Sequence, residues 1–240
     1  MRVGTGDDEK IFQADANALR VLSGYFRTYL PRSQELPAPE EINLPDDEPL
    51  VFEMFIEWSK RPKKPIHYQP GQYSEEPWIS KAVPAWMLAH RLGAPRFEIY
   101  ALSQFIQSCA IALRGPWKFI EDSAPPASSL SRFSNHWVAW NTYLSGSGVN
   151  EYMGLNAAKY ASQVKASTRD PRILDLDHWY SDCGSNINAK CEHDPVFQEQ
   201  ERQAKLLRDR PPPPEWGAEA ETQASGRPTW TSSSTSFSLI

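Results

Sequence analysis

The chain has 240 residues, 40% of them hydrophobic, with 25 basic and 30 acidic side chains and a formal net charge of −5. A chain of this length can bury most of its apolar surface in one domain with an appendage, so folding should not depend on disulfides or a metal. Because basic and acidic residues are intermingled, no basic face is expected to neutralise phosphates, which argues against a nucleic-acid partner.

The three cysteines, an odd number, favour a reducing compartment over a secreted disulfide framework. No basic segment followed by an apolar one stands near Met1, and no stretch reaches about 18 apolar residues. We therefore expect an intracellular protein, cytoplasmic or nuclear, with no membrane partner.

The first twelve residues have the chemistry of a β-hairpin. Short β-capable pieces at residues 2–3 and 10–12 flank a turn rich in glycine and aspartate. The alternative for Val3-Gly4-Thr5-Gly6 is a nucleotide-binding loop, but a further glycine of that pattern is missing and the acidic residues 7–9 would repel a phosphate. We interpret this segment as a hairpin.

One helix is predicted from Asp15 to Leu30. Asp15 is placed to cap its first turn, and Pro31 ends it. The apolar residues that recur at helical spacing are Ala18, Leu19, Leu22, Tyr25 and Phe26.

A strand at residues 41–44 is predicted next, followed by a helix that begins at Pro49, since proline is favoured in a first helical turn. We expect Asp47 to cap this helix. Its apolar face is interpreted as core packed against the sheet, rather than as a ligand-binding stripe. That face carries Val51, Phe52, Phe55, Ile56 and Ser59.

Residues 61–78 are rich in proline and are predicted to cross the surface as an irregular segment. Helical spacing resumes near Trp86, pauses at Gly93-Ala94-Pro95 and continues through residues 97–109. This pattern predicts two helices joined by a sharp corner.

A mainly helical extension is predicted at residues 115–197. Its apolar section from Trp117 to Leu144 is interrupted by a turn signal at residues 123–126, and the later half is expected to be helical. Trp137 and Trp140 in that half are interpreted as core residues. A weaker helix is expected from Glu151 to Lys165.

Residues 198–240 differ in composition from the rest. The run Glu199-Gln200-Glu201-Arg202 is predicted to be a solvated helical face. A proline run at residues 211–214 and a region rich in Ser and Thr follow, with too little apolar surface to offset chain entropy. We expect a largely disordered tail.

Residues 1–114 contain three segments that, in this order, resemble a BTB/POZ domain of the fungal type. The first is similar to its strand-to-helix corner, the second to its next strand and helix, and the third to its closing helix pair. They are Phe12-Gln13-Ala14-Asp15-Ala16-Asn17-Ala18-Leu19 with Ser23-Gly24-Tyr25-Phe26, then residues 41–58, then Ala89-His90-Arg91-Leu92-Gly93-Ala94-Pro95-Arg96-Phe97 with Ala101-Leu102.

The resemblance implies an α+β fold, a small sheet flanked by helices, that assembles with itself or with other proteins. We therefore expect a non-catalytic protein that binds other proteins. It would act either as a scaffold or as an adaptor that recruits a substrate protein. Some BTB/POZ proteins recruit cullin-type ubiquitin ligases. Resemblance to the family does not by itself establish that role for this chain. The alternative is an enzyme whose site is assembled from scattered residues, although the chain has no nucleophile elbow, Walker lysine or zinc-protease motif.

Four potential zinc ligands lie close together in the sequence: His178, Cys183, Cys191 and His193. Thiolate and imidazole both suit tetrahedral zinc, but the arms His-x4-Cys and Cys-x-His lack the paired knuckle of familiar sites. We therefore interpret these residues as ordinary loop residues and expect neither a metal nor a cofactor.

The BTB/POZ resemblance also bears on self-association. In dimeric relatives an acidic residue before the first strand meets a basic residue after the corner histidine. Here the chain starts too late to include the acidic residue, Ala16 stands at the basic position and Asp15 at the histidine. Losing both charges removes the need to pair either, so we expect a monomer or a weak homodimer.

Overall fold

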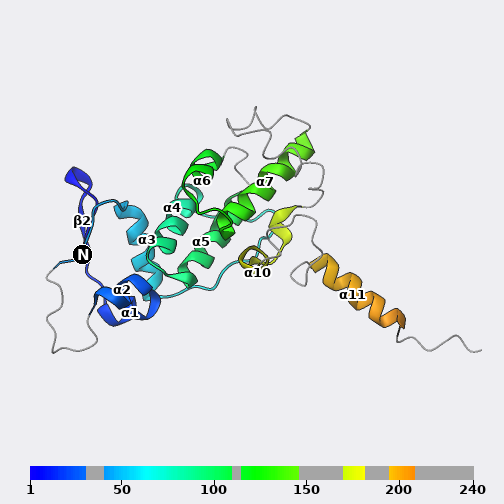
Figure 1. Cartoon of the computed structure of the whole chain (residues 1–240), viewed down its shortest axis with the longest axis horizontal. Helices are drawn as coiled ribbons and strands as arrows, with labels where there is room; N and C mark the ends of the chain where they lie inside the picture. The colour runs from blue at the N-terminus through cyan, green and yellow to red at the C-terminus, as the bar shows by residue number, and fades with distance from the viewer. Residues whose placement is uncertain (31–40, 110–114, 146–169, 182–194, 209–240) are drawn as a thin grey trace, which may run out of the picture. The chain divides into compact units, whose positions relative to one another are not determined.

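The computed structural model describes residues 1–30, 41–109, 115–145, 170–181 and 195–208. The chain divides into a compact unit, Met1–Gln200, and a second unit, Glu201–Ile240. Among the described residues of the first unit, helices predominate and three short strands form one sheet (Figure 1). The fold is therefore α+β, as predicted.

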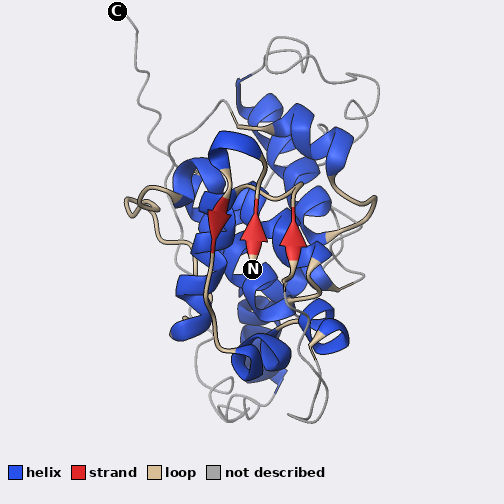
Figure 2. Ribbon diagram, turned by 90° about the vertical axis from the view of Figure 1, so that its left-hand side faces the viewer, coloured by secondary structure: helices blue, strands red, loops and turns tan. Residues whose placement is uncertain are grey.

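The sheet has strand β1 (Arg2–Val3) in the centre, antiparallel to β2 (Lys10–Ile11) and parallel to β3 (Asn43–Leu44) (Figure 2). This confirms the predicted hairpin. Gly4, with φ +83°, follows β1, and a Cβ added there would lie 2.9 Å from Cγ of Pro49. Glycine therefore permits both the turn and the close approach of the next helix.

Residues 16–29 form two helices, so the prediction of one continuous helix was wrong. Helix α1 (Ala16–Leu22) and helix α2 (Gly24–Tyr29) are separated by Ser23, whose backbone is extended at φ −136°. The Ser23 hydroxyl accepts a hydrogen bond from the Phe26 amide at 3.2 Å and caps α2. The cap predicted for the first turn of α1 is confirmed, since Asp15 accepts hydrogen bonds from two amides there.

Helix α3 (Pro49–Lys60) begins at the predicted proline. The predicted cap was wrong: Glu48 occupies the N-cap position without a side-chain hydrogen bond, and the Asp47 carboxylate forms an ion pair with Arg91 instead. The predicted core face is confirmed, with Ser59 half-buried at its end.

The core face of α3 packs mainly on helices, whereas the sequence predicted packing on the sheet. Phe55 is fully buried and its ring lies 5.2 Å from Phe97, 6.0 Å from Phe52 and 6.4 Å from Phe26. The sheet is short, so it leaves most of this apolar face to be covered by helices.

Helices α4 (Trp78–Arg91) and α5 (Pro95–Ser108) pack side by side, and the predicted corner between them is confirmed. Helix α4 begins earlier than the predicted start near Trp86. At the corner Gly93 has φ +57°, and its carbonyl accepts a 2.9 Å hydrogen bond from the amide of Gly24.

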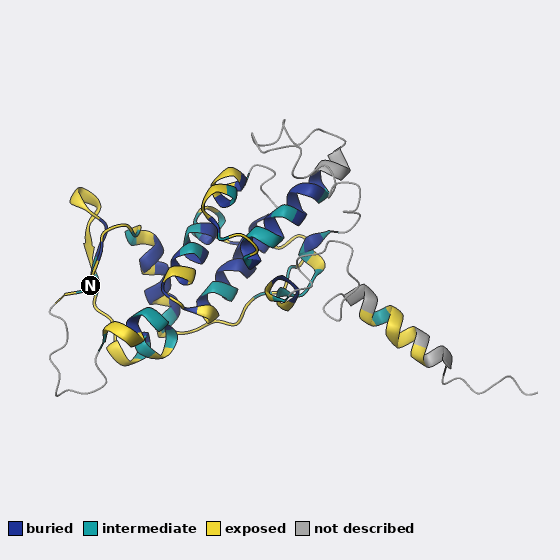
Figure 3. Cartoon of the chain, in the orientation of Figure 1, coloured by how far each residue is buried: buried dark blue, intermediate teal, exposed yellow. Residues whose placement is uncertain are grey.

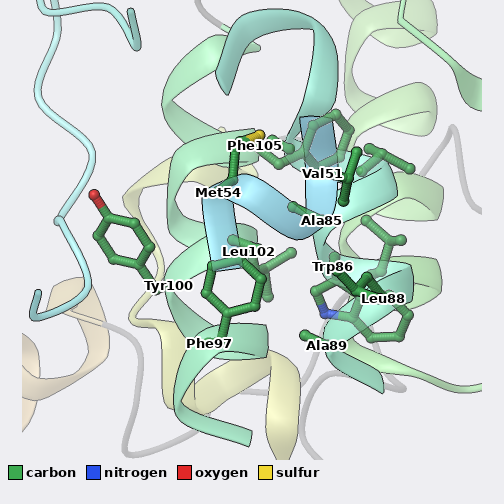
Figure 4. Close-up of a cluster of buried hydrophobic side chains, with 14 of the residues drawn as sticks. Val51, Met54, Ala85, Trp86, Leu88, Ala89, Phe97, Tyr100, Leu102 and Phe105 are labelled. Atoms are coloured by element: carbon green, nitrogen blue, oxygen red, sulfur yellow. The ribbon is translucent and has the colours of Figure 1, made fainter. Parts of the chain in front are cut away.

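Helix α5 is surrounded by other parts of the chain. Every residue from Tyr100 to Cys109 is buried, including polar ones, and the cluster in Figure 4 joins α5 to α3 and α4. Figure 3 shows how buried positions run along these helices.

The predicted irregular segment is confirmed at residues 61–77, and side chains of α5 hold it in place. The Ile66 amide donates to Oγ of Ser103 at 3.2 Å, and the Gln69 amide donates to Oε1 of Gln107 at 3.3 Å. Oγ of Ser74 donates to the Gln104 carbonyl at 2.8 Å.

The predicted turn divides helix α6 (Trp117–Ser123) from helix α7 (Ser129–Ser145). The hydrophobic core continues across residue 114, because Phe105 lies 5.7 Å from Trp117 and 5.8 Å from Phe133. Two short elements, the 3-10 helix η2 (Pro171–Ile173) and helix α10 (Leu176–Tyr180), pack against α7.

Helix α11 spans Pro195–Arg208 and includes the predicted solvated face. On that face Gln200, Glu201 and Arg202 are exposed and Glu199 is half-buried. Of the tail predicted to be largely disordered, residues 198–208 are helical, and residues 209–240 lie outside the described residues, as does the predicted helix at residues 151–165. Among the described helices, none is both long and apolar enough to cross a bilayer.

Candidate binding groove

A groove of about 450 Å³ follows the outer side of α3, next to the face that enters the core. Its residues on α3 and just beyond it recur at helical spacing and therefore share one side of the helix: Leu50, Glu53, Met54, Glu57, Trp58 and Arg61. Lys63, Pro77, Trp78 and Tyr100 complete the lining. We call this set the α3 groove.

Aromatic rings form the apolar wall of the α3 groove. Trp58 lies 6.4 Å from Tyr100, and Trp78 meets Tyr100 edge-to-face at 5.1 Å. Phe97 lies beneath them, 5.2 Å from Trp58 and 6.1 Å from Trp78. Because core rings support them from behind, the groove rings are held in place before any ligand arrives.

Two hydrogen-bond donors of the wall have no acceptor among the described residues. The hydroxyl of Tyr100 accepts a 3.0 Å bond from Nε2 of Gln104, which leaves its own hydrogen available. Burial raises the pKa of Tyr100, so the hydroxyl stays protonated. Figure 4 shows its oxygen pointing away from the labelled core side chains. The indole N–H of Trp78 is the second donor.

The rim of the groove carries paired acids and unpaired bases. Glu53 lies 3.4 Å from Nζ of Lys10, and Glu57 lies 2.5 Å from Nζ of Lys60. By contrast, exposed Arg61 and Lys63 form no ion pair within the described part of the chain. The groove therefore has an excess of positive charge at the end where α3 stops.

The turn that carries these basic residues is fixed by the groove itself. The indole N–H of Trp58 donates a 3.3 Å hydrogen bond to the carbonyl of Lys63. The backbone on which the positive charges stand is thus tied to the aromatic wall, although the side chains extend into solvent.

Chemically, the groove can receive apolar side chains, donate hydrogen bonds to carbonyl oxygens and attract a carboxylate. Its volume lies in the range of small-ligand pockets, but it is open to solvent along the helix. An open groove with an aromatic wall suits an extended or helical segment of another protein.

Apart from the α3 groove, a polar cluster surrounds Arg172, and its contacts hold neighbouring segments of the chain together. Its guanidinium forms a bidentate ion pair with Asp170, with 2.6 Å between Nη2 and Oδ2, and lies 4.4–5.4 Å from three aromatic ring centres. Those rings belong to Tyr68, Trp137 and Trp140. The cluster fastens residues 170–173 to α7 and to the irregular segment.

Of the four potential zinc ligands, the structure describes His178 alone. It is buried on α10, and its ring lies 6.4 Å from His136 of α7. Cys183, Cys191 and His193 lie outside the described residues. Among the residues that are described, no group of three or more His, Cys, Asp or Glu side chains is placed to hold a metal.

The core interpretation of the aromatic stripes is confirmed at Phe52, Phe55, Ile56 and Trp137, whereas Trp140 is half-buried beside Arg172. Sequence reasoning missed the α3 groove. One signal for it was present, since Leu50, Met54 and Trp58 form a second apolar line on α3 beside the core line. The contribution of Tyr100 depends on tertiary packing.

The chain matches no protein-family model, and searches of curated proteins and of solved structures found no match either.

Proposed function

We propose that this protein is a non-catalytic protein-interaction module of BTB/POZ-like type that holds a segment of another protein in the α3 groove. The observation that carries the proposal is the aromatic wall of Trp58, Trp78 and Tyr100, which is supported by the core yet borders an open groove. Aromatic residues in a prearranged pocket contribute most of the binding energy at many interfaces.

The order of elements is consistent with the BTB/POZ resemblance. A strand–hairpin start, a helical pair, a parallel strand, α3 and the α4–α5 corner follow one another as the three resembling segments imply. The adaptor role comes from that resemblance together with the groove, and recruitment of a substrate to a larger assembly would be one form of it.

The experiment is quantitative affinity purification from cells that express the full chain. Wild type is compared with Trp78→Ser, which removes a half-buried ring of the groove wall, and with Ile11→Ser, which removes an apolar side chain that is 70% exposed on β2. Circular dichroism first establishes that both variants fold.

We expect one set of proteins to be retained by wild type and by Ile11→Ser and lost from Trp78→Ser. Retention of the same proteins by all three chains would contradict the proposed role of the groove. Turnover of a small molecule by a preparation that retains no partner would favour the enzyme alternative.

The proposal includes a monomeric or weakly dimeric state. Asp15, which stands at the corner histidine of dimeric relatives, uses its carboxylate to cap α1, and Ala16 is exposed with no charge to bury. Light scattering coupled to size exclusion at micromolar concentration tests this state. A dimer mass that persists on tenfold dilution would contradict it.

A further inference from the structure

We infer that the segment bound in the α3 groove is an acidic peptide with a bulky apolar anchor, its carboxylates lying over Arg61 and Lys63. This inference rests on the proposed function and names the chemistry of the partner. It follows from three features of the groove: the aromatic wall, the two available donors and the charge of the rim.

The aromatic wall sets the anchor. Trp58, Trp78 and Tyr100 pack on one another in this wall, and the apolar surface that it presents to solvent includes half-buried Trp78 and, from α3, Leu50, which is 37% exposed. An aliphatic or aromatic side chain placed over these two residues would remove apolar surface of both molecules from water, at about 25 cal/mol per Å². A peptide with only polar side chains would leave this apolar surface in contact with water and would not gain the corresponding binding free energy.

The two donors favour a main chain over a hydrocarbon ligand. The Trp78 indole N–H and the Tyr100 hydroxyl can each donate to a carbonyl oxygen. Covering them with an apolar ligand would leave both unsatisfied, which costs about 1–3 kcal/mol per buried polar group. A peptide backbone supplies acceptors beside its anchor side chain.

The rim sets the sign of the charge. Glu53 and Glu57 are already neutralised by Lys10 and Lys60, so a basic peptide would have to displace those partners. Arg61 and Lys63 have no such partners among the described residues, and a carboxylate can pair with them without breaking an existing contact. Complementary rim charges act chiefly on the association rate and on specificity.

The net charge of the whole chain allows the effect of the rim to be distinguished from general electrostatic attraction. The net charge of −5 would draw a basic peptide toward the protein and repel an acidic one. Tighter binding of the acidic peptide would therefore report the local rim rather than the average field.

Three fluorescein-labelled synthetic peptides of equal length provide the probes. One carries a central Leu-Trp pair among Asp and Glu, the second replaces every acid by Lys, and the third keeps the acids but replaces the Leu-Trp pair by serines. Fluorescence anisotropy at low and at physiological ionic strength gives their affinities for the full chain.

For wild type we expect the acidic anchored peptide to bind about tenfold tighter than the basic one at low salt, with a smaller ratio at physiological salt. The serine peptide should show no saturable binding. In the double variant Arg61→Glu/Lys63→Glu the preference should reverse toward the basic peptide. A matched variant, Arg96→Glu/Lys205→Glu, has the same change of charge at exposed positions outside the groove and should keep the wild-type order.

Equal binding of the acidic and basic peptides, or the same reversal in the matched variant, would overturn the inference about charge. The proposed function would stand in that case if Trp78→Ser still lost the proteins captured by wild type. If Trp78→Ser kept those proteins, the proposed function would fail as well. Thermal melting of each variant identifies any loss that reflects unfolding.

Discussion

The hydroxyl of Ser23 donates a 2.6 Å hydrogen bond to the carbonyl of Leu92, 69 residues later in the chain. The same oxygen accepts a bond from the Phe26 amide, so one buried side chain caps α2 and joins it to the α4–α5 corner. The adjacent Gly24 and Gly93 strengthen this junction through a backbone hydrogen bond.

Replacing Ser23 by Ala should destabilise the protein by about 1–2 kcal/mol, because the cap of α2 is lost and the buried Leu92 carbonyl keeps only one of its two hydrogen bonds, that from the Tyr25 amide. Urea denaturation at equilibrium measures the change. Ser80→Ala, which removes an exposed hydroxyl, should stay within about 0.5 kcal/mol of wild type. Equal effects of the two substitutions would show that the junction contributes nothing.

Phe55→Asp should unfold the domain. The Phe55 ring is enclosed by Phe26, Phe52 and Phe97, so an aspartate there would be a buried charge without a partner, costing about 4 kcal/mol or more. Far-ultraviolet circular dichroism and thermal melting follow the effect. Ile11→Asp, at an exposed position, is the control and should melt like wild type. A Phe55→Asp variant with unchanged melting would mean that this face of α3 is not core.

Arg172→Lys should destabilise the docking of residues 170–173 even though the charge is kept. Lysine has no planar fork for the bidentate bond to Asp170, and it stacks less well on Tyr68 and Trp137, so we expect a loss of about 1–3 kcal/mol. Arg96→Lys, at an exposed position, serves as the comparison. Chemical denaturation with tryptophan fluorescence is suitable because Trp137 lies beside the guanidinium.

Glu98 should make the stability of the protein depend on pH. Burial raises the pKa of its carboxyl above the ordinary 4.5, although nearby His90 favours the charged form and opposes this effect. Because the folded pKa is the higher one, the favourable contribution is complete below about pH 4.5 and is lost as the pH rises through the folded pKa.

Glu98→Gln removes that titration. The variant should gain stability relative to wild type as the pH is raised from about 4 to about 7. Denaturation midpoints of both proteins at several pH values test this. A difference that stays constant across this range would show that the Glu98 carboxyl has the same pKa in the folded and unfolded chain.

Sequence patterns correctly predicted those parts of the fold whose conformation depends on residues adjacent in the chain. The turn between β1 and β2, the first proline of α3 and the Gly93 corner each depend on residues adjacent in sequence. The break at Ser23 does not, because apolar spacing continues through it and a partner at Leu92 decides the conformation. Asp47 was wrongly predicted as a cap for a similar reason, since Arg91 of α4 takes its carboxylate.

The candidate site was harder to predict than the fold. Trp58 was visible as an apolar residue of α3, but Trp78 and Tyr100 come from two other helices and only packing brings them together. The polar residues of α5 illustrate the same difficulty. Ser103 and Gln107 have the sequence character of a solvent-facing stripe, yet they are buried under the segment that they bind.

That arrangement has a consequence for how the chain opens. The amides of Ile66 and Gln69 belong to a segment without regular secondary structure, yet both donate to side chains of the buried helix α5. The hydrogens of these amides should therefore exchange with solvent slowly, at rates close to those of helical amides. Breaking the two hydrogen bonds would leave buried polar side chains of α5 without these partners, which costs free energy. We therefore expect residues 61–77 and α5 to unfold together as one cooperative unit, so that the turn carrying Arg61 and Lys63 opens only when the core beneath it does.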